Sequence, residues 1–181
     1  TQAELRVGHH NRLEPEGEGL LGLGTEPAFA IGQRALYLRT GAGGLLWDCV
    51  SLVDDATVAS LQALGGVRAI AISHPHFYSA MSEWSRALGG APVYLHAADR
   101  AWVLRDDPAI RYWEGRSLEL APGATLVHCG GHFPGSTVLH WSEGGGGLGA
   151  LLVGDSIMVN QDRRTVSFMY SYPNLIPLGP A

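Results

Sequence analysis

The stretch VRAIAISHPHFYS, residues 67–79, indicates both the fold and a candidate site. Its first seven residues are mostly apolar and follow two glycines, which is typical of a strand covered on both faces. His74 and His76 then flank Pro75 directly after this strand. In extended backbone, side chains two residues apart point to the same side. We therefore predict that both imidazoles converge on one point, as ligands of a metal ion do.

The segments around this stretch predict a mixed sheet with helices packed on it. Residues 29–40 and 45–51 are β-rich runs joined by a glycine turn, which predicts a hairpin. A helix is predicted over 54–65, with Asp54 or Asp55 as its N-cap before an apolar segment. Another is predicted over 79–90, and it precedes a second buried strand at 91–98. This alternation of strands and helices predicts a partly parallel sheet.

The second half of the chain has a different pattern. From residue 117 onward, short strand-like runs are separated by PG, GHFPGS and GGGG, with no room for crossover helices, so antiparallel pairing is predicted. Residues 1–27 are rich in Gly and Glu and weakly periodic, which predicts an extended lead-in. We expect one α+β domain with mixed sheets over residues 28–181.

The composition argues against several partner classes. Charged residues make up 16% of the 181 residues, the net charge is −5, and the twelve basic residues, all arginines, are scattered along the chain. Nucleic acid is not expected as a partner, because phosphate binding needs concentrated positive potential. With no long apolar run and no signal-peptide pattern, we expect a cytoplasmic protein without a membrane partner.

Two more motifs add candidate ligands at predicted strand ends. His132 lies in GGHFPGS (130–136), where glycines allow tight backbone turns. Asp155 ends the apolar run LLVGDS, and a carboxylate there needs a cation or strong donors nearby. Asp48 ends LLWD in the same way, and we predict that it supports a ligand histidine through the second ring nitrogen of that histidine.

Taken in order, these strand-end motifs resemble those of the metallo-β-lactamase superfamily over roughly residues 29–160. The resemblance implies an αββα sandwich with its metal site at an edge between two sheets. It implies that His74, His76, His132 and Asp155 are metal ligands, His74 and His76 being the two histidines of the family motif HxHxDH. A narrower likeness, including TEPAFAIGQRAL and SFMYSYPNLIPL, is to bacterial metallo-hydrolase-like proteins.

This sequence also departs from the family pattern. Tyr78 and Ser79 stand where the family has the Asp and His of its second metal site, so we expect one metal per chain, zinc or alternatively iron. No histidine follows His140, so the last metal-binding histidine of the family has no counterpart. The chain ends before the usual last strand and helix, so we expect a C-terminally shortened fold.

The resemblance predicts a metallo-hydrolase in which a single metal-bound hydroxide attacks an ester, thioester, lactone or amide carbonyl. Asp155 would be a ligand or accept the proton of the water, and Tyr78 would donate a hydrogen bond to the developing oxyanion. Two alternatives stay open. One is a mono-iron dioxygenase acting on a sulfur substrate, and the other is a non-catalytic binding or scaffold protein on a degenerate fold.

The late segment 160–178 combines Arg163 and Arg164 with aromatic residues and prolines. One interpretation is a loop over the pocket of a small-molecule substrate. The other is an interface strip facing a second copy of the chain in a homodimer and made of Phe168, Met169, Tyr170 and Tyr172.

Overall fold

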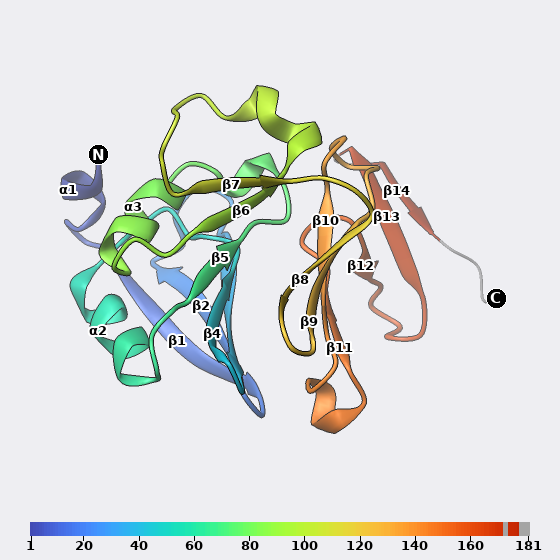
Figure 1. Cartoon of the computed structure of the whole chain (residues 1–181), viewed down its shortest axis with the longest axis horizontal. Coiled ribbons are helices and arrows are strands. Elements are labelled where there is room, and N and C mark those ends of the chain that lie inside the picture. Colours follow the sequence, from blue (N-terminus) through green and yellow to red (C-terminus); the bar gives the residue numbers. More distant parts are fainter. Residues whose placement is uncertain (172–173, 178–181) are drawn as a thin grey trace.

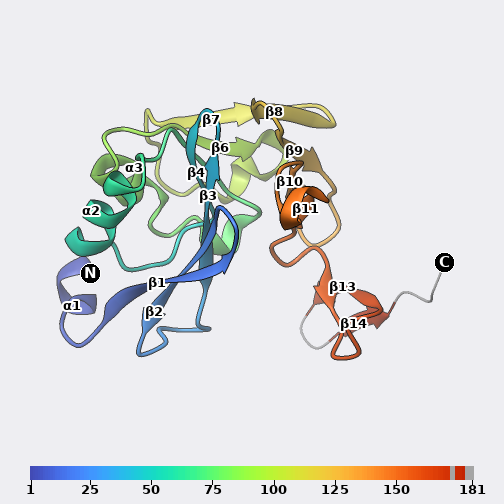
Figure 2. The same ribbon diagram turned by 90° about the horizontal axis from the view of Figure 1, so that it is seen from below.

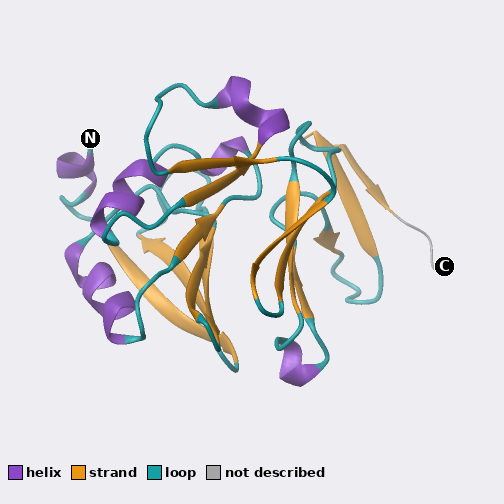
Figure 3. Ribbon diagram, viewed as in Figure 1, coloured by secondary structure: helices purple, strands orange, loops and turns teal. Residues whose placement is uncertain are grey.

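The computed structural model describes residues 1–171 and 174–177. Two sheets face each other, and the α-helices lie on the outer face of the first sheet (Figures 1 and 3). A third, smaller sheet near the C-terminus projects away from both (Figure 2).

The first sheet has seven strands in the order of the sequence. Strands β1 to β4 pair antiparallel, whereas β4 to β7 pair parallel, as the predicted alternation of strands and helices requires. The strands are β1 (His10–Gly17), β2 (Leu20–Glu26), β3 (Arg34–Thr40), β4 (Gly43–Trp47), β5 (Ala69–Ala71), β6 (Val93–His96) and β7 (Ile110–Trp113).

Short helices connect these strands. The Asp54 carboxylate accepts a 2.7 Å hydrogen bond from Thr57 N, so the predicted cap does begin the helix α2. The α-helices are α1 (Gln2–Leu5), α2 (Asp55–Ala63) and α3 (Met81–Ala87), and the 3-10 helices are η1 (Pro75–Phe77), η2 (Ala97–Trp102) and η3 (Gly145–Gly147).

The second sheet is antiparallel throughout, as predicted, with the order β11-β10-β9-β8. The third sheet is also antiparallel, with the order β12-β13-β14. The strands are β8 (Ser117–Ala121), β9 (Ala124–His128), β10 (Thr137–Trp141), β11 (Ala150–Leu152), β12 (Met158–Val159), β13 (Val166–Ser171) and β14 (Asn174–Pro177).

Successive side chains of β4 point to opposite faces of the first sheet, and the apolar core is accordingly divided into two layers. Leu46 packs with the helices on one face of the first sheet, whereas Leu45 and Trp47 pack between the two sheets. Trp84 of α3 is fully buried in the first layer, and Leu126 of β9 is buried in the second. The sandwich is thus held by apolar contacts on both faces of one sheet.

The extended lead-in predicted for residues 1–27 is instead part of the first sheet. Residues 10–26 form the hairpin β1–β2, and β2 pairs with β3. Leu23 is fully buried, and Leu13 and Leu21 pack against the same core. The many Gly and Glu residues hid this apolar alternation from the sequence analysis.

The predicted fold class, α+β with mixed sheets, is confirmed. Helices cover the outer face of the first sheet (Figure 3), while no α-helix follows β8 in the part of the chain that the structure describes. None of the helices among the described residues is long and apolar enough to cross a membrane.

Candidate metal centre

The first two predicted ligands follow β5 as the sequence suggested, but their backbone differs from the prediction. His74 is extended, with φ −167° and ψ 170°, whereas Pro75–Phe77 form the 3-10 turn η1. The convergence of His74 and His76 therefore comes from this turn rather than from a continuous extended segment. Proline fits there because the first position of a helical turn needs no backbone N–H donor.

His132 lies in the loop between β9 and β10. This loop is closed by the carbonyl of Ser136, which accepts hydrogen bonds from the backbone N–H groups of Cys129 (2.9 Å) and Gly130 (3.0 Å). Gly130 has φ +66°, which glycine adopts at low cost. The loop reaches the first sheet through Thr137 N, which donates to the carbonyl of Ser73 at 2.9 Å.

Asp155 follows β11 of the second sheet after Gly154. Gly154 has φ +51°, and a β-carbon built on it would lie 2.5 Å from Ser73 Oγ. A glycine is required here because any larger residue would meet Ser73.

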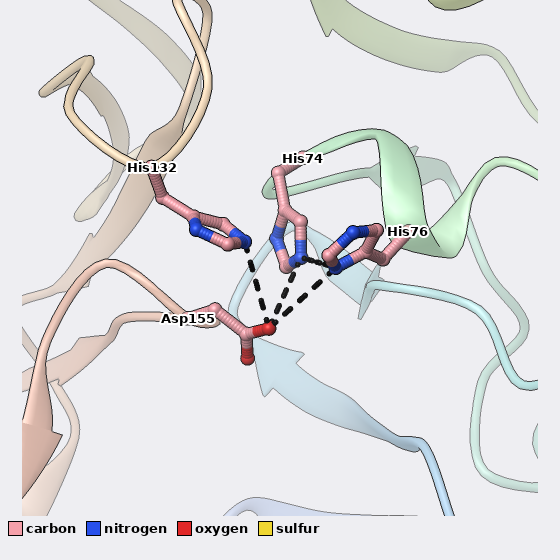
Figure 4. Close-up of side chains that lie close together, drawn as sticks. All are labelled: His74, His76, His132 and Asp155. Atoms are coloured by element: carbon pink, nitrogen blue, oxygen red, sulfur yellow. Dashed lines mark hydrogen bonds and ion pairs between the residues drawn. The ribbon is translucent and has the colours of Figure 1, made fainter. Parts of the chain in front are cut away.

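The four predicted ligands meet at one point (Figure 4). Asp155 Oδ2 lies 3.3 Å from His74 Nε2, 3.8 Å from His76 Nδ1 and 3.8 Å from His132 Nε2. His74 Nε2 and His76 Nδ1 are 3.1 Å apart. Two donors follow a strand of the first sheet and two come from loops of the second, so the group joins the layers.

These four donors fit a single metal ion. Ligands about 2.0–2.1 Å from a tetrahedral Zn²⁺ lie about 3.4 Å from one another. The four ligand atoms lie within 4.8 Å of one another, and within residues 1–171 and 174–177 they form the one group of at least three His, Cys, Asp or Glu side chains able to hold a metal. Exposure of the side chains rises from 1% at His74 to 47% at His76, so the group is open to solvent on one side.

Asp48 supports His74 through a serine. The hydroxyl of Ser73 lies 2.8 Å from His74 Nδ1 and 2.8 Å from Asp48 Oδ1, and Ser73 N donates to the same carboxylate oxygen at 2.7 Å. The sequence predicted a direct contact between Asp48 and a ligand histidine. This prediction is wrong in detail, because Ser73 lies between Asp48 and His74. Fixing Nδ1 in this way leaves His74 Nε2 facing the site.

The environment shifts the pKa of three groups around the site. Burial raises the pKa of Asp48 to about 7, against the opposing effect of the Ser73 hydrogen bonds. The hydrogen bond to His74 lowers the pKa of Asp155, which keeps this carboxylate ionised. Burial, followed by the neighbouring His74, lowers the pKa of His76 and favours the neutral imidazole that a metal requires.

Tyr78, predicted as an oxyanion donor, lies among the buried core residues with 8% of its surface exposed. Burial raises the pKa of Tyr78 well above its usual range, so the hydroxyl stays protonated. Ser79, the other residue at the positions of the second metal site, is exposed, and its carbonyl accepts a hydrogen bond from Arg105. Neither residue belongs to the group of candidate ligands.

The sequence analysis missed three residues that shape the site. Gln33 Nε2 donates to the carbonyl of His76 at 2.6 Å, across 43 positions of the chain. Phe133 stacks on His74 with ring centroids 5.7 Å apart. Asp99 accepts a 2.7 Å hydrogen bond from Gly135 N under the His132 loop. Phe133 adjoins a ligand in the sequence, but Gln33 and Asp99 carry no such signal.

Neither cysteine belongs to the ligand group, Cys49 being buried and Cys129 exposed. In the late segment, Phe168 is 41% exposed. Tyr172, named for the interface strip, lies outside the described residues.

Two cavities border the centre. The larger, of about 480 Å³, extends from Asp155 and His76 between the first sheet and β11. The smaller, of about 260 Å³, lies beside η1 and η2 and is bordered by His76, Tyr78 and Trp102. His76 therefore borders both.

Comparison with solved structures identifies the class to which this fold belongs. The metallo-β-lactamase DIM-1 matches with a TM-score of 0.62 at 14% identity, over 74% of this chain and 66% of that chain. VMB-1 matches with a TM-score of 0.61 at 15% identity, over 72% of this chain and 64% of that chain. The chain therefore has the metallo-β-lactamase fold, which confirms the resemblance seen in the sequence.

Two nearer relatives in sequence were found. TTHA1623, solved in a di-iron-bound form, is 28% identical with a TM-score of 0.52, over 64% of this chain and 65% of that chain. The uncharacterized protein YmaE of Bacillus subtilis (strain 168) is 50% identical over 168 residues, which cover 93% of this chain. The match covers 61% of the length of YmaE. No protein-family model matches the chain.

Proposed function

We propose that this protein is a metal-dependent hydrolase that acts on a carbonyl substrate, namely an ester, thioester, lactone or amide. The observation that carries the proposal is the convergence of three imidazoles and one carboxylate beside an open cavity. The fold shared with the metallo-β-lactamase DIM-1 supports it.

His74, His76, His132 and Asp155 would hold one metal ion. When bound, this ion supplies a Lewis acid that polarises a carbonyl oxygen and acidifies water. Asp155 would be the fourth ligand or the base that accepts a proton from the attacking water, since its carboxylate is ionised and lies among the ligand atoms. The Asp48–Ser73 pair fixes the ring of His74.

Tyr78 remains a predicted donor to the carbonyl oxygen. It borders the smaller cavity together with His76, and its phenol stays protonated. Removal of one oxyanion donor typically costs about 10²–10³ in kcat. Tyr78→Phe should therefore lower kcat without changing the metal content.

Zinc is the metal we propose, with iron as the alternative. Imidazole and carboxylate ligands suit both metals, and TTHA1623 was solved in a di-iron-bound form. One metal per chain follows from Tyr78 and Ser79, which are poor ligands at neutral pH.

The test combines elemental analysis with an ester and thioester hydrolysis panel. The wild type should hold about one equivalent of metal, and His132→Ala should lose both the metal and the activity. His140→Ala is the control, because His140 is an exposed strand histidine outside the ligand group. Full metal occupancy in His132→Ala would show that the ligand assignment is wrong.

The same samples distinguish the two alternatives. Iron together with oxygen consumption on a persulfide would indicate the dioxygenase. A protein without bound metal, and without loss of stability on chelation, would indicate a binding or scaffold role.

A further inference from the structure

The larger cavity is continuous with the candidate metal centre. Its near end is formed by Asp155, Gly154 and His76, and its far end reaches Leu20 and Ala150. Between these ends it follows β11 and then the turn over residues 153–156, in which Ser156 N donates to the carbonyl of Val153 at 3.0 Å. Its volume of about 480 Å³ lies in the range of small-molecule sites.

Away from the centre, the walls are mainly apolar. Leu36 and Trp47 of the first sheet lie on one side, and Leu151 and Leu152 of β11 on the other. Arg34 is the charged residue on the walls distant from the centre, and its guanidinium is 3.0 Å from Glu16. Its charge is thus already matched, so the cavity favours an uncharged, apolar group.

The smaller cavity shares His76 with the larger one but does not reach Asp155. Its lining mixes polar side chains, such as Ser82 and Arg105, with apolar ones, such as Met81 and Trp102. The two halves of a substrate lie on opposite sides of its scissile carbonyl, so one cavity can hold the acyl chain and the other the leaving group. The larger volume of the first cavity assigns the acyl chain to it.

We infer that the substrate carries an uncharged aliphatic acyl chain, which lies in the larger cavity between the first sheet and β11 while its carbonyl faces the ligand group. This inference rests on the proposed function for its reaction. It assigns to Leu151 and Ile31, which line the cavity from β11 and from the loop before β3, a role in selecting chain length.

The test is a series of p-nitrophenyl esters from acetate to decanoate, assayed with metal-loaded protein. Each methylene buried should raise kcat/KM about fourfold until the cavity is full. Leu151→Trp should flatten this gradient by narrowing the cavity. Leu148→Trp is the matched control, because Leu148 is 94% exposed and does not line the cavity. Ile31→Trp gives a second narrowing variant, at a side chain that is 79% exposed and so tolerant of change.

Calorimetric titration with octanoate gives a readout independent of turnover. Binding to the wild type and to Leu148→Trp, with at least tenfold weaker binding to Leu151→Trp, supports the assignment even if no ester is hydrolysed, in which case only the proposed function fails. Hydrolysis with no dependence on acyl length overturns the inference and leaves the proposed function standing. A gradient that follows the length of the alcohol in alkyl acetates, or equal effects of both Leu→Trp variants, also overturns it.

Discussion

Gly154 lies so close to Ser73 that a β-carbon on the glycine would be 2.5 Å from the serine hydroxyl and 2.6 Å from its β-carbon. This contact brings the segment carrying Asp155 against the segment carrying His74. Site geometry therefore depends on the absence of one side chain.

Gly154→Ala should destabilise the protein and weaken metal binding. Gly66→Ala is a matched control, because Gly66 also has positive φ, +78°, but a β-carbon there meets nothing within 4 Å. Backbone strain should lower the free energy of unfolding of the Gly66→Ala control by about 1–2 kcal/mol. Steric overlap should lower that of Gly154→Ala by about 1–3 kcal/mol more. Urea unfolding and zinc titration check this, and equal losses in both variants would contradict it.

Ser73→Ala should weaken metal binding by about 10–100-fold, because His74 loses the hydrogen bond that orients its ring. Ser85→Ala is the control: Ser85 is equally buried, and its hydroxyl bonds the carbonyl of Ala91 away from the site. Both variants should lose some stability, but only Ser73→Ala should change the metal affinity measured by competition with a chelator. Unchanged affinity in Ser73→Ala would remove the proposed role of this serine.

Chelation should lower the melting temperature of the wild type. A metal present at a hundredfold its Kd stabilises the folded state by about 2.7 kcal/mol. For a chain of this size, that corresponds to about 5–11 °C in Tm. His76→Ala should show no such shift, whereas His140→Ala should keep it. Scanning calorimetry with and without chelator makes the comparison.

The pH dependence of stability should reveal the buried carboxylate under the His132 loop. Asp99 is 1% exposed, and burial raises its pKa above the model-compound value of 3.8 despite the hydrogen bond from Gly135. A raised folded-state pKa stabilises the protein fully below pH 3.8, and this contribution is lost as pH rises through the folded pKa. The free energy of unfolding of Asp99→Asn should therefore increase relative to wild type from pH 4 to pH 8.

Asp107→Asn is a control in which the opposite pH dependence of stability is expected, measured in metal-free protein. The backbone hydrogen bond from Ala109 lowers the pKa of Asp107, so its contribution is present above pH 3.8 and is lost as pH falls through the folded pKa. If the difference in free energy of unfolding between Asp99→Asn and wild type stays constant with pH, Asp99 has the same pKa in the folded and unfolded states, and the prediction is wrong.

Much of the fold could be predicted because local patterns and tertiary structure agree. The apolar run before His74 became the buried parallel strand β5, and Asp54 capped α2 as its position before an apolar segment suggested. The hairpin over residues 10–26 escaped prediction because its pairing with β3 supplies stability that its own Gly- and Glu-rich sequence does not indicate.

The four candidate ligands could be predicted from the sequence, whereas the residues that hold those ligands in position could not. Histidines at strand ends have a recognisable chemistry, so His74, His76 and His132 stood out. A serine beside a histidine is unremarkable in sequence, and the importance of Ser73 comes from Asp48, 25 positions earlier. Gln33 likewise reaches His76 only because the chain folds back. Such tertiary contacts have no local signature.

The ligand group draws two donors from each side of the sandwich, His74 and His76 after β5 and His132 and Asp155 from the loops of the facing sheet. An ion bound there would act as a cross-link between the layers, restricting any sliding or parting of the two sheets. Catalysis and the cohesion of the two sheets would then depend on the same ion.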